Sequence, residues 1–135
     1  MTLPRIFSIR PLRHGRLYAI VVVHDSLPEL WREAKKDPRH VTKTKGLVAY
    51  CQGIWSPDGK FCEIHFAKTR LGTNTLAHEC YHATQRWLQA RGWTQRNNVT
   101  NMQNGKRSTE EWAAVVHGNL LAGIVTSLYA EGLLK

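Results

Sequence analysis

The sequence predicts an α+β domain, in which a small and mostly antiparallel sheet of about four strands carries two long helices. Short segments rich in β-branched and aromatic residues recur in the first half, and proline- or glycine-containing breaks separate them. The second half holds two long stretches whose apolar residues have close to helical spacing. A chain of 135 residues has the size of one domain with one core, so we expect a single domain over residues 1–135.

The beginning of the chain is expected to supply two paired strands and one short helix. Residues 6–10 and 17–23 are rich in β-branched and aromatic side chains, with a proline and a glycine between them. Residues 27–36 follow Ser26, which can act as an N-cap, and carry a proline near their start. This pattern predicts a short amphipathic helix.

A β-hairpin is expected next. Residues 47–54 and 60–68 flank the turn sequence Ser-Pro-Asp-Gly at 56–59, which has proline and glycine at typical turn positions. The predicted order of elements along the whole chain is β-β-α-β-β-α-α.

The second half predicts two long helices joined by a polar loop. Asn74 can cap a helix that runs to Arg91 and stops at Gly92. Residues 94–107 are mostly polar and predict a loop, and a final helix is expected from about 108 to 128 or beyond. The first of these helices has an apolar stripe formed by Leu76, Cys80, Ala83, Trp87 and Leu88.

The sequence His78-Glu79-Cys80-Tyr81-His82 is an HExxH motif inside the first long helix. Residues at i and i+4 project from one helix face, so both imidazoles can reach one metal ion about 2 Å from each nitrogen. Glu79 is offset to meet a water on that ion. The motif therefore predicts one Zn²⁺ per chain, with Glu79 as general base; the alternative is a pair of surface or packing histidines in a domain without metal.

The third zinc ligand is expected to be a glutamate at the start of the last helix. Glu111 lines up with an apolar face that has several small residues, as expected where this helix packs closely on the HExxH helix, and we therefore predict Glu111. That face contains Ala114, Val115, Gly118, Ala122 and Val125. Glu110 is the substitute, and it lines up with Ala113, Ala114, His117 and Leu121. Residues 108–111 are also a capping box, in which Glu111 would bond to the backbone of Ser108 instead.

These segments resemble the small phage and bacterial HExxH proteins of the minigluzincin type. The resemblance covers roughly residues 60–125: a strand at 61–68, the helix with the HExxH motif, and a later helix that opens Glu110-Glu111-Trp112-Ala113-Ala114. It implies a zincin-like minimal core and, from the second glutamate of the E-E-x-x-A segment, Glu111 as third ligand. It also implies that the strand before the HExxH helix is a cleft edge beside the active site.

The function predicted from the motif is zinc-dependent hydrolysis of peptide bonds in a peptide or protein substrate, with His78, His82 and Glu111 as ligands. A rival of another class is a zinc-stabilised binding protein without catalysis, with a phage origin as one option, that acts on nucleic acid or a host protein. His117 and Tyr129 are conceivable donors to an oxyanion, but an ordinary helical role is the simpler interpretation of each.

Positive charge is concentrated in the first half of the chain. Residues 1–70 hold 13 Lys and Arg against 6 Asp and Glu, within a net charge of +9. This balance leaves nucleic acid as a possible partner, with residues 32–45 as the best candidate surface, beside the alternative of an ordinary solvated face. The apolar runs are too short for a membrane span, no signal peptide is evident, and the three cysteines lack paired spacing. We therefore expect no membrane partner, reduced thiols and a cytoplasmic location, the host cytoplasm for a phage protein.

Overall fold

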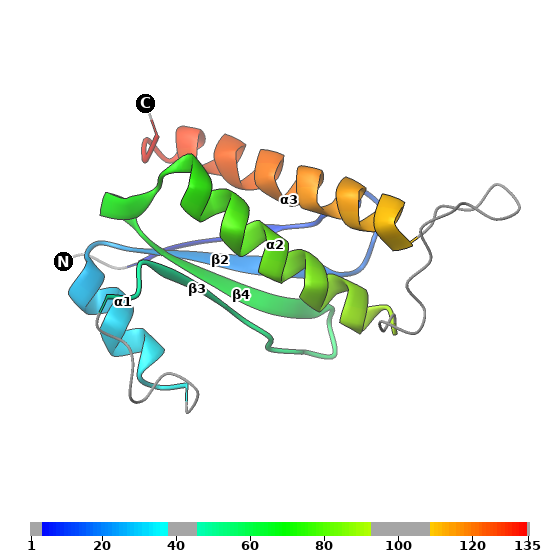
Figure 1. The fold of residues 1–135 in the computed structure, drawn as a ribbon, viewed down its shortest axis with the longest axis horizontal. Helices are drawn as coiled ribbons and strands as arrows, with labels where there is room; N and C mark the ends of the chain where they lie inside the picture. Colours follow the sequence, from blue (N-terminus) through cyan, green and yellow to red (C-terminus); the bar gives the residue numbers. More distant parts are fainter. Residues whose placement is uncertain (1–3, 38–45, 93–108, 135) are drawn as a thin grey trace, which may run out of the picture.

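The computed structural model describes residues 4–37, 46–92 and 109–134, and these form four strands and three α-helices in the predicted order (Figure 1). The elements are β1 (Arg5–Ile9), β2 (Tyr18–His24), α1 (Leu27–Ala34), β3 (Ala49–Gln52), β4 (Lys60–Ala67), a 3₁₀ turn η2 (Lys68–Arg70), α2 (Thr73–Ala90) and α3 (Thr109–Ala130). The predicted α+β class with a four-stranded sheet is therefore confirmed. The predicted loop at 94–107 and the start of the last helix at Ser108 lie outside the described residues.

The sheet has the strand order β1-β2-β4-β3. Both outer pairs are antiparallel, which confirms the predicted pairing of β1 with β2 and the β3–β4 hairpin. The central pair, β2 with β4, is parallel, because the chain leaves β2 and passes through α1 and β3 before β4 returns beside it. The sheet is thus mixed but mostly antiparallel.

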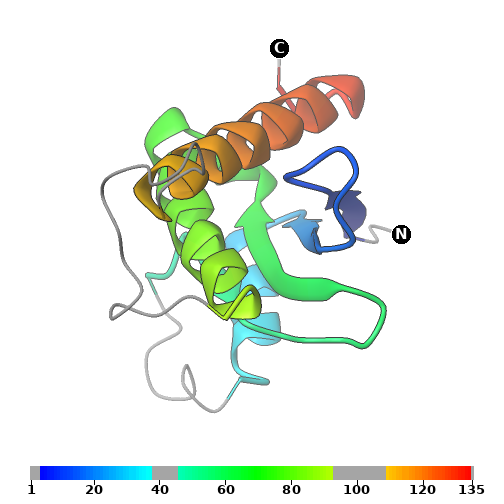
Figure 2. The same ribbon diagram turned by 90° about the vertical axis from the view of Figure 1, so that its right-hand side faces the viewer.

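Helices cover both faces of the sheet. Figures 1 and 2 show α2 and α3 side by side on one face and α1 against the other. Between the sheet and the helix pair lies the main core, in which Ile64 and Phe66 of β4 meet Cys80 of α2 and Leu120 of α3. A smaller cluster lies under α1 and consists of Leu30, Ala34, Tyr50 and Ala67 with their neighbours.

The start of α1 was predicted correctly and the start of α2 was not. Ser26 caps α1, and its Oγ accepts a hydrogen bond from the backbone N–H of Glu29 at 3.3 Å. The prediction that Asn74 caps α2 is wrong, because Gly72 holds the extended N-cap conformation and Asn74 lies inside the first turn. The predicted end is confirmed, since Gly92 follows the helix with a positive φ of 79°.

The buried side of α3 differs from the predicted one. Its buried residues are Val116, Leu120, Ile124 and Leu128. On the expected contact face, Ala114, Gly118 and Ala122 are exposed, and Val115 and Val125 are only partly buried. The prediction failed because α3 is apolar on nearly all sides, so its pattern marks no single face. Among the described helices, only α3 is long and apolar enough to cross a membrane by length and composition, a criterion that core helices also meet.

Candidate metal centre

The two histidines of the HExxH motif lie on the solvent-facing side of α2. The opposite side of the helix is buried, and it includes the predicted stripe of Leu76, Cys80, Ala83, Trp87 and Leu88. Both His78 and His82 are exposed, and their rings meet edge to face with centroids 4.7 Å apart. Helical spacing therefore separates the ligand candidates from the core, as the sequence predicts.

The histidine nitrogens are at a separation that suits a tetrahedral metal ion. His82 Nε2 lies 3.1 Å from His78 Nε2. Two zinc ligands at about 2.0–2.1 Å in tetrahedral geometry hold their donor atoms about 3.3 Å apart. Only a small side-chain adjustment separates the observed pair from that geometry, so these two residues fit the ion that the motif implies.

Glu79 is buried beside this pair, on a helix face next to that of the histidines. Its side chain is largely inaccessible, with 5% of the residue exposed, and its Oε2 lies 4.0 Å from His78 Nε2. Burial raises the pKa of the Glu79 carboxyl, and the charge of His78 opposes that rise. A carboxyl group with a raised pKa, 4.0 Å from one of the two candidate ligand nitrogens, has the properties of a general base that returns its proton.

The charge state of His82 also suits metal binding. Burial lowers its pKa, and the positive charges of His78 and Arg86 add to this effect. A neutral imidazole is the form that binds a metal. The surroundings of His82 thus favour its ligand form.

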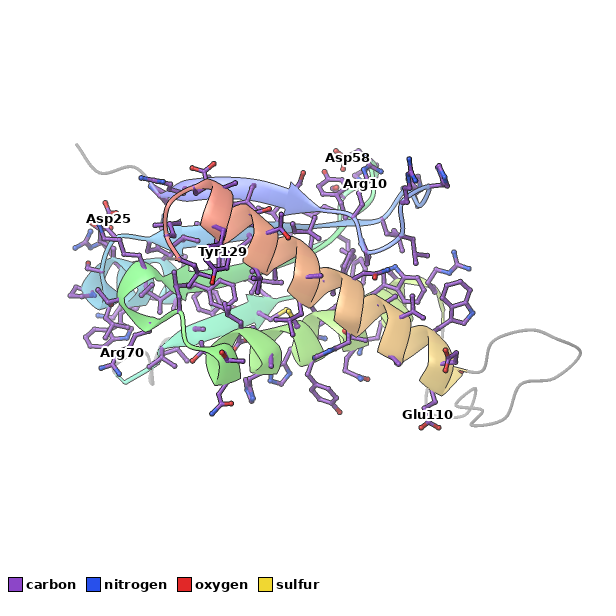
Figure 3. The ribbon with its side chains drawn as sticks, turned by 90° about the horizontal axis from the view of Figure 1, so that it is seen from above. Arg10, Asp25, Asp58, Arg70, Glu110 and Tyr129 are labelled. Atoms are coloured by element: carbon purple, nitrogen blue, oxygen red, sulfur yellow. The ribbon has the colours of Figure 1, made fainter. Side chains whose placement is uncertain are left out.

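No third ligand is in place within the parts of the chain that the structure describes, where no group of three His, Cys, Asp or Glu side chains comes together. Glu110 and Glu111 are both exposed in the first turn of α3. Figure 3 shows Glu110 projecting outward from that turn. The selection of Glu111 over Glu110 therefore stays a prediction.

The orientation of α3 weakens the argument that selected Glu111. His117 contacts α2, with its Nε2 3.3 Å from the carbonyl oxygen of Ala77, immediately before His78. Glu110 lies two turns before His117 and shares its side of the helix, whereas Glu111 is turned about 100° further round. The face that meets α2 is thus the one that lines up with Glu110. The sequence reasoning missed the contact of His117 with α2. The sequence does show that His117 lies on the same side of the helix as Glu110, but not which element that side meets.

The prediction that residues 60–68 form a cleft edge is wrong. Strand β4 pairs with β2 on one side and with β3 on the other, so it lies inside the sheet. The strand at the edge on this side is β3, and Gly53 after it lies next to the side chain of Arg86 on α2. An edge strand beside the helix exists, but it is the first arm of the hairpin.

Other predicted details have mixed outcomes. The thiols are free, with Cys62 and Cys80 buried and Cys51 partly buried, as expected for reduced cysteines. His24 and His65 have no metal-ligand spacing in the sequence but are neighbours in the structure, where His24 Nε2 lies 2.9 Å from His65 Nδ1 on the sheet face under α1. The pairing of β2 with β4 brings the two histidines together, and sequence spacing cannot show this.

The candidate nucleic-acid surface was predicted at residues 32–45. Residues 38–45 lie outside the described residues, and Lys36, in the described part, pairs with Glu33.

Comparisons with known proteins found no matching family model, no matching curated protein and no matching solved structure. The resemblance to minigluzincin-type proteins thus depends on the quoted residues alone. The geometry of the site does not depend on that resemblance: an exposed, closely spaced histidine pair with a buried glutamate beside it lies on a helix that covers a small mixed sheet.

Proposed function

We propose that this protein is a zinc-dependent metallopeptidase that hydrolyses peptide bonds in a peptide or protein substrate. One observation carries the proposal: the Nε2 atoms of His78 and His82 lie 3.1 Å apart on the exposed face of α2, with Glu79 buried next to them. In this proposal the two histidines and Glu111 hold one zinc ion. Glu111 is retained because of the resemblance at the E-E-x-x-A segment, and Glu110, which shares the side of α3 that meets α2, is the alternative third ligand.

The division of chemistry follows from the residue types. Zinc, when bound, supplies a Lewis acid that polarises a carbonyl and makes water acidic enough to attack near neutral pH. Glu79 accepts the proton of the attacking water and then delivers it to the leaving amide nitrogen. Its burial suits both steps, because a carboxyl with a raised pKa binds the proton more readily than an exposed one.

The replacement of Glu79 by glutamine tests whether the site is catalytic. Glu79→Gln keeps the size and burial of the side chain but removes its basicity, so zinc content should stay unchanged while peptide cleavage falls by at least about 100-fold. Cleavage would be followed on a denatured casein substrate and on a mixed peptide library by mass spectrometry, with Gln85→Ala on the exposed face of α2 as the control.

Either outcome of this experiment is decisive for the rival function. If the zinc-loaded wild type cleaves and Glu79→Gln does not, the site is catalytic. If the two proteins give the same products at the same rates, Glu79 is not the base. A zinc-stabilised binding protein without catalysis would then be the better account.

A further inference from the structure

The loop between β1 and β2 concentrates positive charge at one end of the sheet. Residues 10–16 contain three arginines, one histidine and no acidic residue. Within residues 4–37, 46–92 and 109–134, four of the other basic side chains pair with carboxylates, and these are Arg5, Lys36, Lys60 and Lys68. None of the described ion pairs includes Arg10, Arg13 or Arg16. The three arginines of this loop therefore make no ion pair with a described carboxylate.

This loop is held in a fixed conformation. The backbone N–H of Gly15 donates to the carbonyl of Leu12 at 2.9 Å, which closes a tight turn with Arg13 at its corner. From α3, Asn119 Nδ2 donates to the carbonyl of Pro11 at 2.7 Å. Leu12 also packs against the main core. Because the turn is closed by its own hydrogen bond and the residues before Arg13 are anchored, an anion that contacts Arg13 orders little additional chain on binding.

The two other arginines are positioned by contacts that leave donors available. Arg10 Nη1 donates to the carbonyl of Gly15 at 2.9 Å, and its guanidinium lies over the ring of Tyr18 at 5.8 Å. Arg16 Nη1 donates to the carbonyl of Pro57 at 3.2 Å, which joins this loop to the β3–β4 loop. A guanidinium has five donors, so each arginine retains donors for phosphate oxygens.

The β3–β4 loop, which Arg16 contacts at the same end of the sheet, carries an exposed aromatic side chain, Trp55, and one acidic residue, Asp58. Trp55, two residues before Pro57 in the β3–β4 loop, is 51% exposed. Asp58 accepts a hydrogen bond from the Tyr18 hydroxyl at 2.7 Å, and Figure 3 shows it close to Arg10. Arg16 contacts the loop that carries Trp55, and arginines combined with an exposed aromatic ring are what single-stranded nucleic acids bind, through phosphate contacts and base stacking.

We propose that Arg10, Arg13, Arg16 and Trp55 form a binding surface for single-stranded nucleic acid. The arginines contact successive phosphates, and one base stacks on the indole of Trp55. A membrane fits less well, because one exposed aromatic side chain does not make the apolar face that surface binding to lipid needs. The inference is independent of the metal centre.

Fluorescence anisotropy with a labelled single-stranded 15-mer tests this proposal in the full chain. Three phosphate contacts predict a slope of about −2 for log affinity against log salt, which is about a 20-fold loss between 50 and 200 mM. Arg13→Glu should weaken binding about tenfold and reduce the slope by about 0.7. Lys35→Glu, an exposed change of equal charge at the C-cap of α1, should weaken binding less than about twofold. Trp55→Ala should weaken binding at least about fivefold.

The same experiment can overturn the proposal. Absence of saturable binding by wild type at 50 mM salt would do so. Equal weakening by Arg13→Glu and Lys35→Glu would also do so, because the net charge alone would then explain binding. Tighter binding to vesicles of phosphatidylcholine and phosphatidylserine than to the oligonucleotide would identify a membrane surface instead. Arg13 is exposed and makes no described side-chain contact, so Arg13→Glu should keep the circular dichroism spectrum of the wild type.

Discussion

Two histidine pairs with nearly equal nitrogen–nitrogen distances lie on opposite sides of the sheet, and their ring geometry and surroundings differ: the rings of His78 and His82 meet edge to face, whereas those of His24 and His65 are stacked. The His78–His82 nitrogens are 3.1 Å apart on the exposed face of α2, and the His24–His65 nitrogens are 2.9 Å apart under α1. Both members of the second pair are buried, with 6% and 3% of each residue exposed. Closeness of two imidazoles therefore does not by itself identify a metal site, because their accessibility and remaining partners decide their role.

The buried pair has its hydrogen-bonding capacity used within the protein. His65 Nε2 lies 3.1 Å from Glu63 Oε1, and Tyr50 stacks on the His65 ring at a centroid distance of 4.5 Å. If His65 donates to Glu63 through Nε2, its Nδ1 accepts from the N–H of His24 Nε2. Two neutral rings thus complete a chain of hydrogen bonds between β2 and β4, which is a structural role.

The largest expected difference between the pairs is in folding stability. His65→Ala should lower the free energy of unfolding by about 2–4 kcal/mol, since it leaves a cavity and unpaired partners beneath α1. His78→Ala should change it by less than about 0.5 kcal/mol, because the side chain is exposed. Urea unfolding with a chelator present measures the free energy of unfolding of both variants. Equal losses in His65→Ala and His78→Ala would contradict the distinction between the buried and the exposed pair.

The second difference is in the response to pH. Burial lowers the pKa of both His24 and His65, and the acids Glu29, Glu33 and Glu63 only partly oppose this. The unfolded chain then binds more protons below its histidine pKa of about 6.5, so stability is constant above that value and falls as the pH decreases below it. We expect a loss of about 1–2 kcal/mol between pH 7 and 5.5 in metal-free protein.

A variant without the exposed pair is the control for this pH dependence. His78→Ala/His82→Ala keeps both buried histidines and should lose stability over the same pH range as the wild type. If its curve becomes flat, the exposed pair rather than the buried one is the source of the effect.

The smallest expected effect comes from the helix that covers the buried pair. Ser26→Ala removes the N-cap bond to the backbone of Glu29 and should cost about 1 kcal/mol. Because α1 lies on the face opposite to α2, zinc content should stay unchanged in this variant. If Ser26→Ala lost zinc together with stability, the packing of α1 on one face of the sheet would be coupled to the metal centre on the other. Nothing in the packing of the described residues predicts such coupling.

The elements of the fold were predictable because their signals are local. Ser26 with Pro28, the turn at residues 56–59 and Gly92 each specify a cap, a hairpin or a helix end through conformational preferences of a few residues. The buried stripe of α2 follows from helical spacing in the same way. These signals also separate the exposed histidines from the core.

Features that depend on long-range pairing were not predictable from one sequence. The position of β4 inside the sheet follows from its parallel pairing with β2, and so does the contact of His24 with His65. In α3, apolar residues surround the helix, so the sequence did not reveal that His117 faces Ala77. The selection between Glu110 and Glu111 depends on that same orientation, and this is why the sequence alone leaves it open.

Zinc content per chain, measured by elemental mass spectrometry on tag-free protein after removal and re-addition of metal, tests the central claim most directly. We predict about one zinc in the wild type, loss of it in His78→Ala and Glu111→Ala, and retention in Glu110→Ala and in His24→Gln. Loss in Glu110→Ala instead of Glu111→Ala would reassign the third ligand and keep the site. A wild-type protein that takes up no zinc, or a His78→Ala variant that retains it, would contradict the assignment of the exposed pair as a metal centre.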